Sequence, residues 1–252
     1  MRLRRRDLLP LLLLAAPAAA QQRLVPVTPE TPAGAALVER LRAGGLVLFF
    51  RHADTRGEPC DASYRIGDRT GQRNISPEGI AQSRRIGERL AALGIPLARP
   101  VLAGPVFRAR DTAEQAFGAA DVLVTDSLLA DDYAGGRLAW VLAEHRRLFS
   151  EPVPRGTNRV LVGHRTPAIM VAGQAVGGRA FPEGAALVIE PDGDGFRVLG
   201  ILDLAPLPGG RLPPMRLRAA CRPAQWTKRF SSTRCSRGLP AIRWPPAPPA
   251  PR

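Results

Sequence analysis

Two histidines stand at positions where this sequence could carry out chemistry. His52 follows the apolar run 46–50 and has Arg51 directly before it. His164 follows a second run, 159–163, which is apolar after Arg159. An imidazole nitrogen can attack phosphorus, and a guanidinium can bind two phosphate oxygens at once. Arg51 and His52 together therefore suit the transfer of a phosphoryl group, with the imidazole of His164 as a further contact to the same anion.

Both apolar runs predict strands that are buried on both faces of a parallel sheet. In open α/β sheets, ligands bind at the carboxyl ends of the strands, where loops and helix N-termini converge. We therefore expect the rings of His52 and His164 to face one crevice. Rings more than about 10 Å apart could not hold a single phosphoryl group, so this distance tests the hypothesis.

The rest of the body alternates short apolar strands with helical patterns, which predicts an α/β layer fold. Ser76 followed by Pro77 and Glu78 is typical of a helix start, since it supplies a capping hydroxyl, a proline in the first turn and an acid near the helix N-terminus. Further strands are expected at 100–103 and 122–124, a hairpin at 186–190 with 196–202, and further helices at 109–117, 137–149 and from about residue 166.

Four segments resemble, in the expected order, motifs of the histidine phosphatase superfamily, which is also called phosphoglycerate-mutase-like. The resemblance covers about residues 44 to 203, and the segments are 50–53, 74–82, 103–113 and 160–164. Two positions depart from the family pattern. Ala53 replaces a glycine, and Gly104 replaces a serine, which removes a hydroxyl and would loosen the pocket wall.

This resemblance implies a three-layer α/β/α fold with a mostly parallel central sheet. It also implies that His52 accepts the phosphoryl group and that water then hydrolyses the phosphohistidine. Arg51, Arg108 and His164 would surround the non-bridging oxygens, and Asn74 would be a weaker donor. The reaction needs no metal or other cofactor, and the substrate would be a small phosphorylated compound. Arg56 is an alternative to Asn74, and Arg165 faces either the substrate or solvent.

The proton for the leaving oxygen has several candidate donors. Relatives often place an acid beyond the segment that carries the arginine, and Asp131 and Asp132 stand there in this chain. Glu183 is a rival from the loop after the second histidine, and Asp54 ranks lower. Without an acid in place, substrates with good leaving groups would be favoured over alkyl esters.

The formal charge of +14 lies mostly at the two ends of the chain: residues 1–20 carry +3 and residues 206–252 carry +10, which leaves +1 for the body. The charge therefore does not predict specific nucleic-acid binding. Basic, apolar and small residues follow one another in 1–20, as in a cleaved export signal of either the Sec or the twin-arginine type. The apolar run is too short for a permanent membrane anchor.

We therefore expect four regions: an export signal at 1–20, a lead-in at 21–43, a phosphatase domain at 44–205 and a disordered tail rich in proline and arginine at 206–252. Three cysteines are too few for a fold built on disulfides. The third histidine, His145, lies among polar residues, which favours a solvated position. The function expected is an exported phosphatase of the periplasm or exterior, with a catalytically impaired anion-binding protein as the alternative. Oligomeric state is left open.

Overall fold

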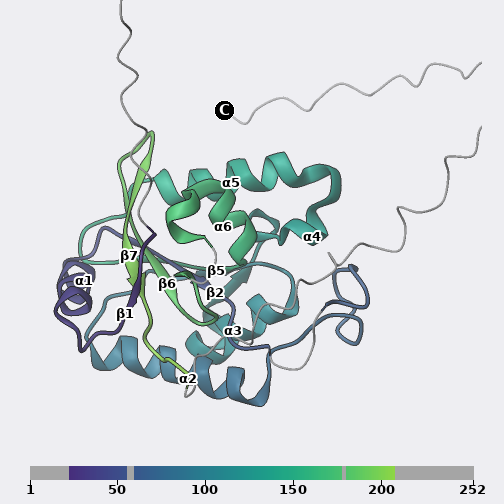
Figure 1. Cartoon of the computed structure of the whole chain (residues 1–252), viewed down its shortest axis with the longest axis horizontal. Coiled ribbons are helices and arrows are strands. Elements are labelled where there is room, and N and C mark those ends of the chain that lie inside the picture. Colours follow the sequence, from purple (N-terminus) through teal and green to yellow (C-terminus); the bar gives the residue numbers. More distant parts are fainter. Residues whose placement is uncertain (1–22, 56–59, 178–179, 208–252) are drawn as a thin grey trace, which may run out of the picture. The chain divides into compact units, whose positions relative to one another are not determined.

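A seven-stranded sheet forms the centre of this computed structural model, which describes residues 23–55, 60–177 and 180–207 (Figure 1). The strand order is β1-β7-β6-β2-β5-β3-β4. Four neighbouring pairs are parallel, and the pairs β2–β6 and β6–β7 are antiparallel. The strands are β1 (Pro26–Val27), β2 (Val47–Arg51), β3 (Val101–Ala103), β4 (Val122–Val124), β5 (Arg159–Gly163), β6 (Ala186–Pro191) and β7 (Phe196–Leu202).

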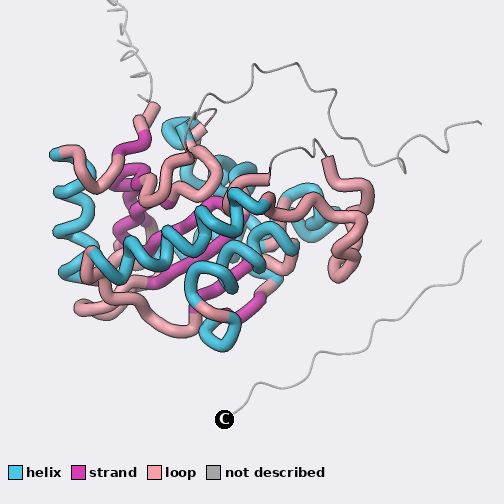
Figure 2. Tube along the Cα trace, turned by 90° about the horizontal axis from the view of Figure 1, so that it is seen from below, coloured by secondary structure: helices cyan, strands magenta, loops and turns pink. Residues whose placement is uncertain are grey.

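Helices cover both faces of the sheet, so the predicted three-layer α/β/α architecture is confirmed. Side chains of α1, α2 and α3 pack on the face that holds Leu48 and Phe50, while α5 and α6 pack on the face that holds Val47 and Phe49. Figure 2 looks onto the first of these layers. The helices are α1 (Pro32–Ala43), α2 (Pro77–Ala92), α3 (Phe107–Phe117), α4 (Asp131–Ala134), α5 (Leu138–Ser150) and α6 (Arg165–Ala172).

The predicted helix start at Ser76 is confirmed. The Ser76 hydroxyl accepts a hydrogen bond from the Gly79 amide at 2.9 Å, and Pro77 is the first residue of α2. Gly79 itself has a packing role, because a Cβ there would lie 2.3 Å from the carbonyl oxygen of Asp54. The start of α2 is thus fixed directly against the loop that follows β2.

The ordered domain begins earlier than the predicted boundary at residue 44. Strand β1 pairs in parallel with β7, and the side chains of Leu37, Val38 and Leu41 on α1 are buried in the core. Helix α1 begins after Thr31, whose hydroxyl accepts from the Gly34 amide. The two-residue strand β1 gives no periodic signal, but Leu37, Val38 and Leu41 have helical spacing, which the predicted boundary did not take into account.

The prediction of a solvated His145 is wrong, because its side chain is fully buried. Its ring lies 5.9 Å from that of Phe49, and its Nδ1 donates to the Val141 carbonyl at 2.8 Å. On α5 the spacing of Val141, His145 and Leu148 places all three on the face that packs on the sheet. The polar neighbours of His145 in sequence belong to the opposite face.

The predicted export signal lies outside the described residues, and so does the predicted tail apart from residues 206 and 207. Within the described ranges, no helix has the length and apolar character to cross a membrane.

Candidate active site

His52 and His164 come together at the carboxyl ends of two neighbouring parallel strands, β2 and β5. The register pairs Arg51 with Gly163, so that each histidine is the first residue beyond its strand. The His52 amide donates to the Gly163 carbonyl at 3.0 Å. The two ring centroids lie 5.6 Å apart with an angle of 53° between the rings, and each residue is only 3% exposed. The predicted convergence of the two imidazoles is therefore confirmed.

The hydrogen bonds of His52 leave its outer nitrogen available as a nucleophile. Nδ1 lies 2.9 Å from the Ala53 carbonyl oxygen, which can only accept, so the proton of the neutral ring is on Nδ1 and the lone pair is on Nε2. Burial, and then the charges of Arg51 and Arg108, lower the pKa of His52 well below its usual value. The ring is therefore neutral near pH 7. Ala53, the departure from the family's glycine, donates its amide to the Thr112 hydroxyl at 2.8 Å.

His164 is a second neutral ring in the same site. Burial lowers its pKa well below the usual value, and the charge of Arg108 adds to the effect. Its Nε2 has no hydrogen-bond partner among residues 23–55, 60–177 and 180–207. A buried nitrogen of this kind is costly unless a ligand completes its hydrogen bonding. An N–H at this position could donate to one oxygen of an anion held beside His52.

Arg108 enters the site from the first turn of α3 and is 4% exposed. Its charge lowers the pKa of both His52 and His164, which places the guanidinium near both rings. Nη1 lies 3.1 and 3.2 Å from the two carboxylate oxygens of Asp61. Nε has no hydrogen-bond partner within the described part of the chain. The guanidinium thus has one side on a carboxylate and a donor left for another anion.

The charge of Arg51 also lowers the pKa of both histidines, while its two terminal nitrogens are engaged by Glu183 and Phe181. Nη2 donates to the Glu183 carboxylate at 2.7 Å and Nη1 donates to the Phe181 carbonyl at 2.8 Å. Burial lowers the pKa of Arg51 to about 10, so it remains charged near pH 7. The oxygens of Glu183 also accept from the amide and hydroxyl of Thr55, both at 3.2 Å. Glu183 therefore holds Arg51 and the loop after β2 together.

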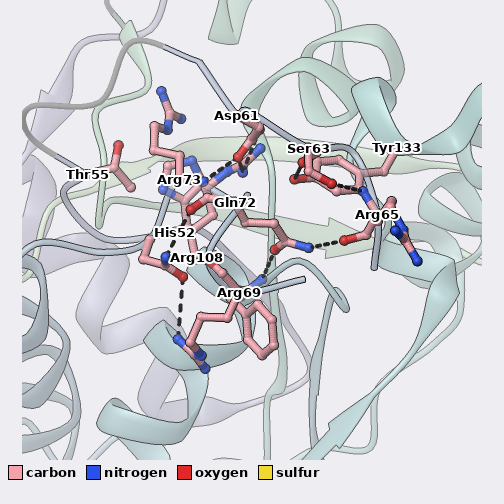
Figure 3. A network of polar contacts seen from close by, with 12 residues as sticks. His52, Thr55, Asp61, Ser63, Arg65, Arg69, Gln72, Arg73, Arg108 and Tyr133 are labelled. Atoms are coloured by element: carbon pink, nitrogen blue, oxygen red, sulfur yellow. Dashed lines mark hydrogen bonds and ion pairs between the residues drawn. The ribbon is translucent and has the colours of Figure 1, made fainter. Parts of the chain in front are cut away.

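Asp61 and Arg73 belong to the site although the sequence did not indicate either of them. The Arg73 amide donates to the Asp61 carboxylate at 2.5 Å, and the charge of Arg73 lowers the pKa of His52 and His164. Figure 3 shows Asp61 beside Arg73 and Arg108. The stretch 60–76 has neither helix nor strand periodicity, and the family motifs do not include these two positions. No sequence signal could have found them.

The candidate acids lie in different surroundings. Burial raises the pKa of Asp131, where the charge of Asp132 adds to the effect, and burial also raises the pKa of Asp132. Asp131 accepts a hydrogen bond from Thr166, two residues beyond the second histidine. By contrast, Asp54 accepts from the Ser76 hydroxyl at 2.6 Å and so braces the start of α2.

Three further residues were predicted as possible contacts to the phosphoryl group: Asn74, Arg165 and Arg56. The Asn74 amide nitrogen donates to the carbonyls of Arg69 and Gln72, both at 2.9 Å, which commits it to its own loop. The charge of Arg165 lowers the pKa of Arg51, so the two guanidiniums lie near each other. Arg56 falls outside the described residues.

The departure of Gly104 from the family pattern suggested a loosened pocket wall, but the structure shows no such loosening. A Cβ at this position would lie 2.3 Å from the Leu128 carbonyl oxygen and 3.6 Å from Nε2 of His164. The backbone before α4 therefore fills the space that a serine side chain would need. Glycine is required here because the chain carrying Leu128 packs directly on the end of β3.

Two neutral imidazoles, two buried guanidiniums and nearby carboxylates can together bind a tetrahedral oxyanion and transfer its central group. In the part of the chain that the structure describes, no group of three or more histidine, cysteine, aspartate or glutamate residues is arranged to hold a metal ion.

The sequence matches no protein-family model and no curated protein. Among solved structures, the chain is similar to the protein histidine phosphatase SixA in complex with tungstate, at 17% identity and a TM-score of 0.41, over 63% of this chain and 97% of that one. It is also similar to a mycobacterial glucosyl-3-phosphoglycerate phosphatase in complex with VO3, at 19% identity and a TM-score of 0.43, over 64% and 99% of the two chains. A third similar structure is a phosphoserine phosphatase mutant from Entamoeba histolytica, at 11% identity and a TM-score of 0.42, over 62% and 95%.

Proposed function

We propose that this protein is a phosphatase that hydrolyses small phosphomonoesters through a phosphohistidine on His52. The observation that carries the proposal is the geometry at the ends of β2 and β5. There the ring of a neutral His52, with its lone pair on Nε2, lies beside the ring of His164, and the charges of Arg51 and Arg108 act on both rings. A buried, neutral imidazole among cations suits attack on a phosphorus atom that carries negative oxygens.

In the first step, the Nε2 lone pair of His52 forms a bond to phosphorus while the bond from phosphorus to the leaving oxygen breaks. The leaving oxygen takes a proton from a carboxylic acid and departs as an alcohol. Arg51, Arg108 and His164 stabilise the charge on the non-bridging oxygens. In the second step, water attacks the phosphohistidine and gives one proton back to the carboxylate. Phosphate leaves, and His52 is regenerated.

Asp131 and Asp132 are the acids that we favour. Burial raises the pKa of both carboxyls, which keeps more of the protonated form that an acid needs. The charge of Arg108 opposes this effect, and its action on both carboxyls indicates that they lie near the site. The carboxylate of Glu183 is held in the ion pair with Arg51, and that of Asp54 accepts from the Ser76 hydroxyl.

The test uses the full chain with p-nitrophenyl phosphate and a panel of phosphorylated metabolites. We expect turnover by the parent, loss of turnover in His52→Ala, and a phosphorylated parent protein when the reaction is quenched rapidly. Undiminished turnover by His52→Ala would refute the proposal.

A second candidate function is the binding of phosphate without turnover. It is favoured by one observation: each of the two arginines that would hold the phosphoryl group is already paired with a carboxylate, Arg51 with Glu183 and Arg108 with Asp61. Phosphate binding with no turnover of any substrate in the panel would support this candidate over the enzyme.

Export is part of the proposed function. Its support is the sequence of residues 1–20, where a basic segment, an apolar run and small residues follow one another. Expression of the full chain followed by N-terminal sequencing of the extracytoplasmic fraction tests it. We expect a mature N-terminus near Gln21, and an intact N-terminus on cytoplasmic protein would contradict export.

A further inference from the structure

We propose that Asp61 is a positioning residue that holds the guanidinium of Arg108 in its reactive orientation. The inference rests on the proposed function and adds a residue to that site. Neither the sequence pattern nor the family resemblance points to Asp61.

The ion pair between Asp61 and Arg108 is buried, with both side chains 5% exposed. Both carboxylate oxygens of Asp61 lie near the same nitrogen, Nη1 of Arg108, at 3.1 and 3.2 Å. Nε of Arg108 keeps no partner within residues 23–55, 60–177 and 180–207. Asp61 therefore fixes one corner of the guanidinium and leaves a donor free for the phosphoryl oxygens.

Asp61 is itself held in place by the loop 60–76. The backbone amide of Arg73 donates at 2.5 Å to Oδ1 of Asp61, which also accepts from Nη1 of Arg108. The loop in turn is docked on the first turns of α3, the helix that carries Arg108. Arg69 donates to the Asp111 carboxylate at 2.6 and 2.8 Å, and Gln72 accepts from the Phe107 amide at 3.0 Å. Loop and helix thus form one anchored unit around the ion pair.

The physical need for such a residue follows from the length of the arginine side chain and from its surroundings. An arginine has several rotatable bonds, and its catalytic value in phosphoryl transfer depends on the direction of its N–H groups. The charge of Arg73 acts on the same part of the site as that of Arg108. A buried cation among cations would turn away from the site without an anion to hold it.

The sign of the charge on Asp61 makes the inference testable. A carboxylate next to the phosphate site repels the phosphate dianion, so it does not contribute to simple anion attraction. A positioning role therefore predicts different effects of the substitution on kcat and on the affinity for phosphate. Removal of the charge slows the chemical step, because Arg108 loses its orientation, while the affinity for phosphate does not fall.

The experiment compares Asp61→Asn with the parent full chain, measuring kcat and KM for p-nitrophenyl phosphate and the inhibition constant of inorganic phosphate. We expect kcat to fall by about 10- to 100-fold, with phosphate bound as tightly as by the parent or more tightly. Glu114→Gln is the matched control, because it makes the same chemical change on α3, where Glu114 pairs with Arg110 at the surface. The control is expected to keep the kcat of the parent.

A double-mutant cycle decides whether Asp61 acts through Arg108. In the Arg108→Ala background, Asp61→Asn is expected to have little further effect on kcat. Independent effects, an unchanged kcat in Asp61→Asn, or a parallel loss of phosphate affinity would each overturn the inference. Thermal unfolding is recorded for every variant. If Asp61→Asn does not fold, Asp61→Ser replaces it, because it also removes the charge, and the same result for kcat and phosphate affinity is expected.

Failure of this inference is separate from failure of the proposed function. The proposed function fails if the parent has no turnover or if His52→Ala retains it. Neither result depends on Asp61.

Discussion

The rings of His52 and His164 lie 5.6 Å apart, although the two residues follow different strands of the sheet. Parallel neighbours in register bring their carboxyl ends to the same edge, so two residues that are distant in the chain become neighbours in space. The same edge receives Arg108 from α3 and Arg51 from β2.

The ionisation of His52 is expected to reflect its burial and its cationic neighbours. Because these lower its pKa well below 6.5, His52 should stay neutral, with its proton on Nδ1, as the pH falls from 7.5 to 6. Nitrogen-15 NMR of the ring measures both the protonation state and the tautomer. In Arg108→Ala the pKa of His52 should rise, because a nearby cation is removed. A ring that takes up its proton near pH 6.5 in the parent would contradict the prediction.

The identity of the acid is expected to appear as a dependence on the leaving group. Loss of the acid costs about 10²- to 10⁴-fold in kcat/KM for alkyl phosphates, and far less for p-nitrophenyl phosphate, whose leaving group needs little protonation. We expect this pattern in Asp131→Asn or in Asp132→Asn. Glu183→Gln should instead lower kcat/KM for both kinds of substrate by similar factors, because it breaks the ion pair with Arg51. Equal losses on both substrates in both aspartate variants would exclude the two aspartates.

Gly104→Ala is expected to destabilise the fold by about 1–3 kcal/mol, because the added methyl group would overlap the Leu128 carbonyl. Gly136→Ala is the matched control: nothing lies within 4 Å of the Cβ position there, and its effect should stay within about 0.5 kcal/mol. Urea unfolding at equilibrium measures both changes in the free energy of unfolding. A Gly104→Ala protein as stable as the parent would show that the backbone at Leu128 can move away.

The buried His145 should make stability depend on pH. Its pKa in the folded state is lowered by burial, so between about pH 6.5 and its folded pKa the unfolded chain binds a proton that the folded chain does not. The free energy of unfolding therefore falls as the pH drops below about 6.5. His145→Leu should reduce this slope, while the shifted pKa values of His52 and His164 preserve part of it. Unfolding midpoints recorded from pH 7.5 to pH 5 measure the slope, and an unchanged slope in His145→Leu would contradict the assignment.

The sequence alone determined the parts of this protein that depend on local chemistry. The apolar runs at 46–50 and 159–163 predicted two buried strands, and the order of Ser76, Pro77 and Glu78 predicted the start of α2. The arginine and histidine next to one another at the end of the first run indicated phosphoryl chemistry. Each of these signals lies within a few residues, where periodicity and capping act.

The contacts of Asp61, His145 and Gly104 were decided only by the tertiary structure. The ion pair of Asp61 with Arg108 joins a loop without periodicity to a helix start, and the burial of His145 depends on which face of α5 meets the sheet. The requirement for Gly104 comes from Leu128, which packs on it from another element. Such contacts form between segments that are distant in the chain, and they depend on strand order and packing, which leave no local pattern in the residues themselves.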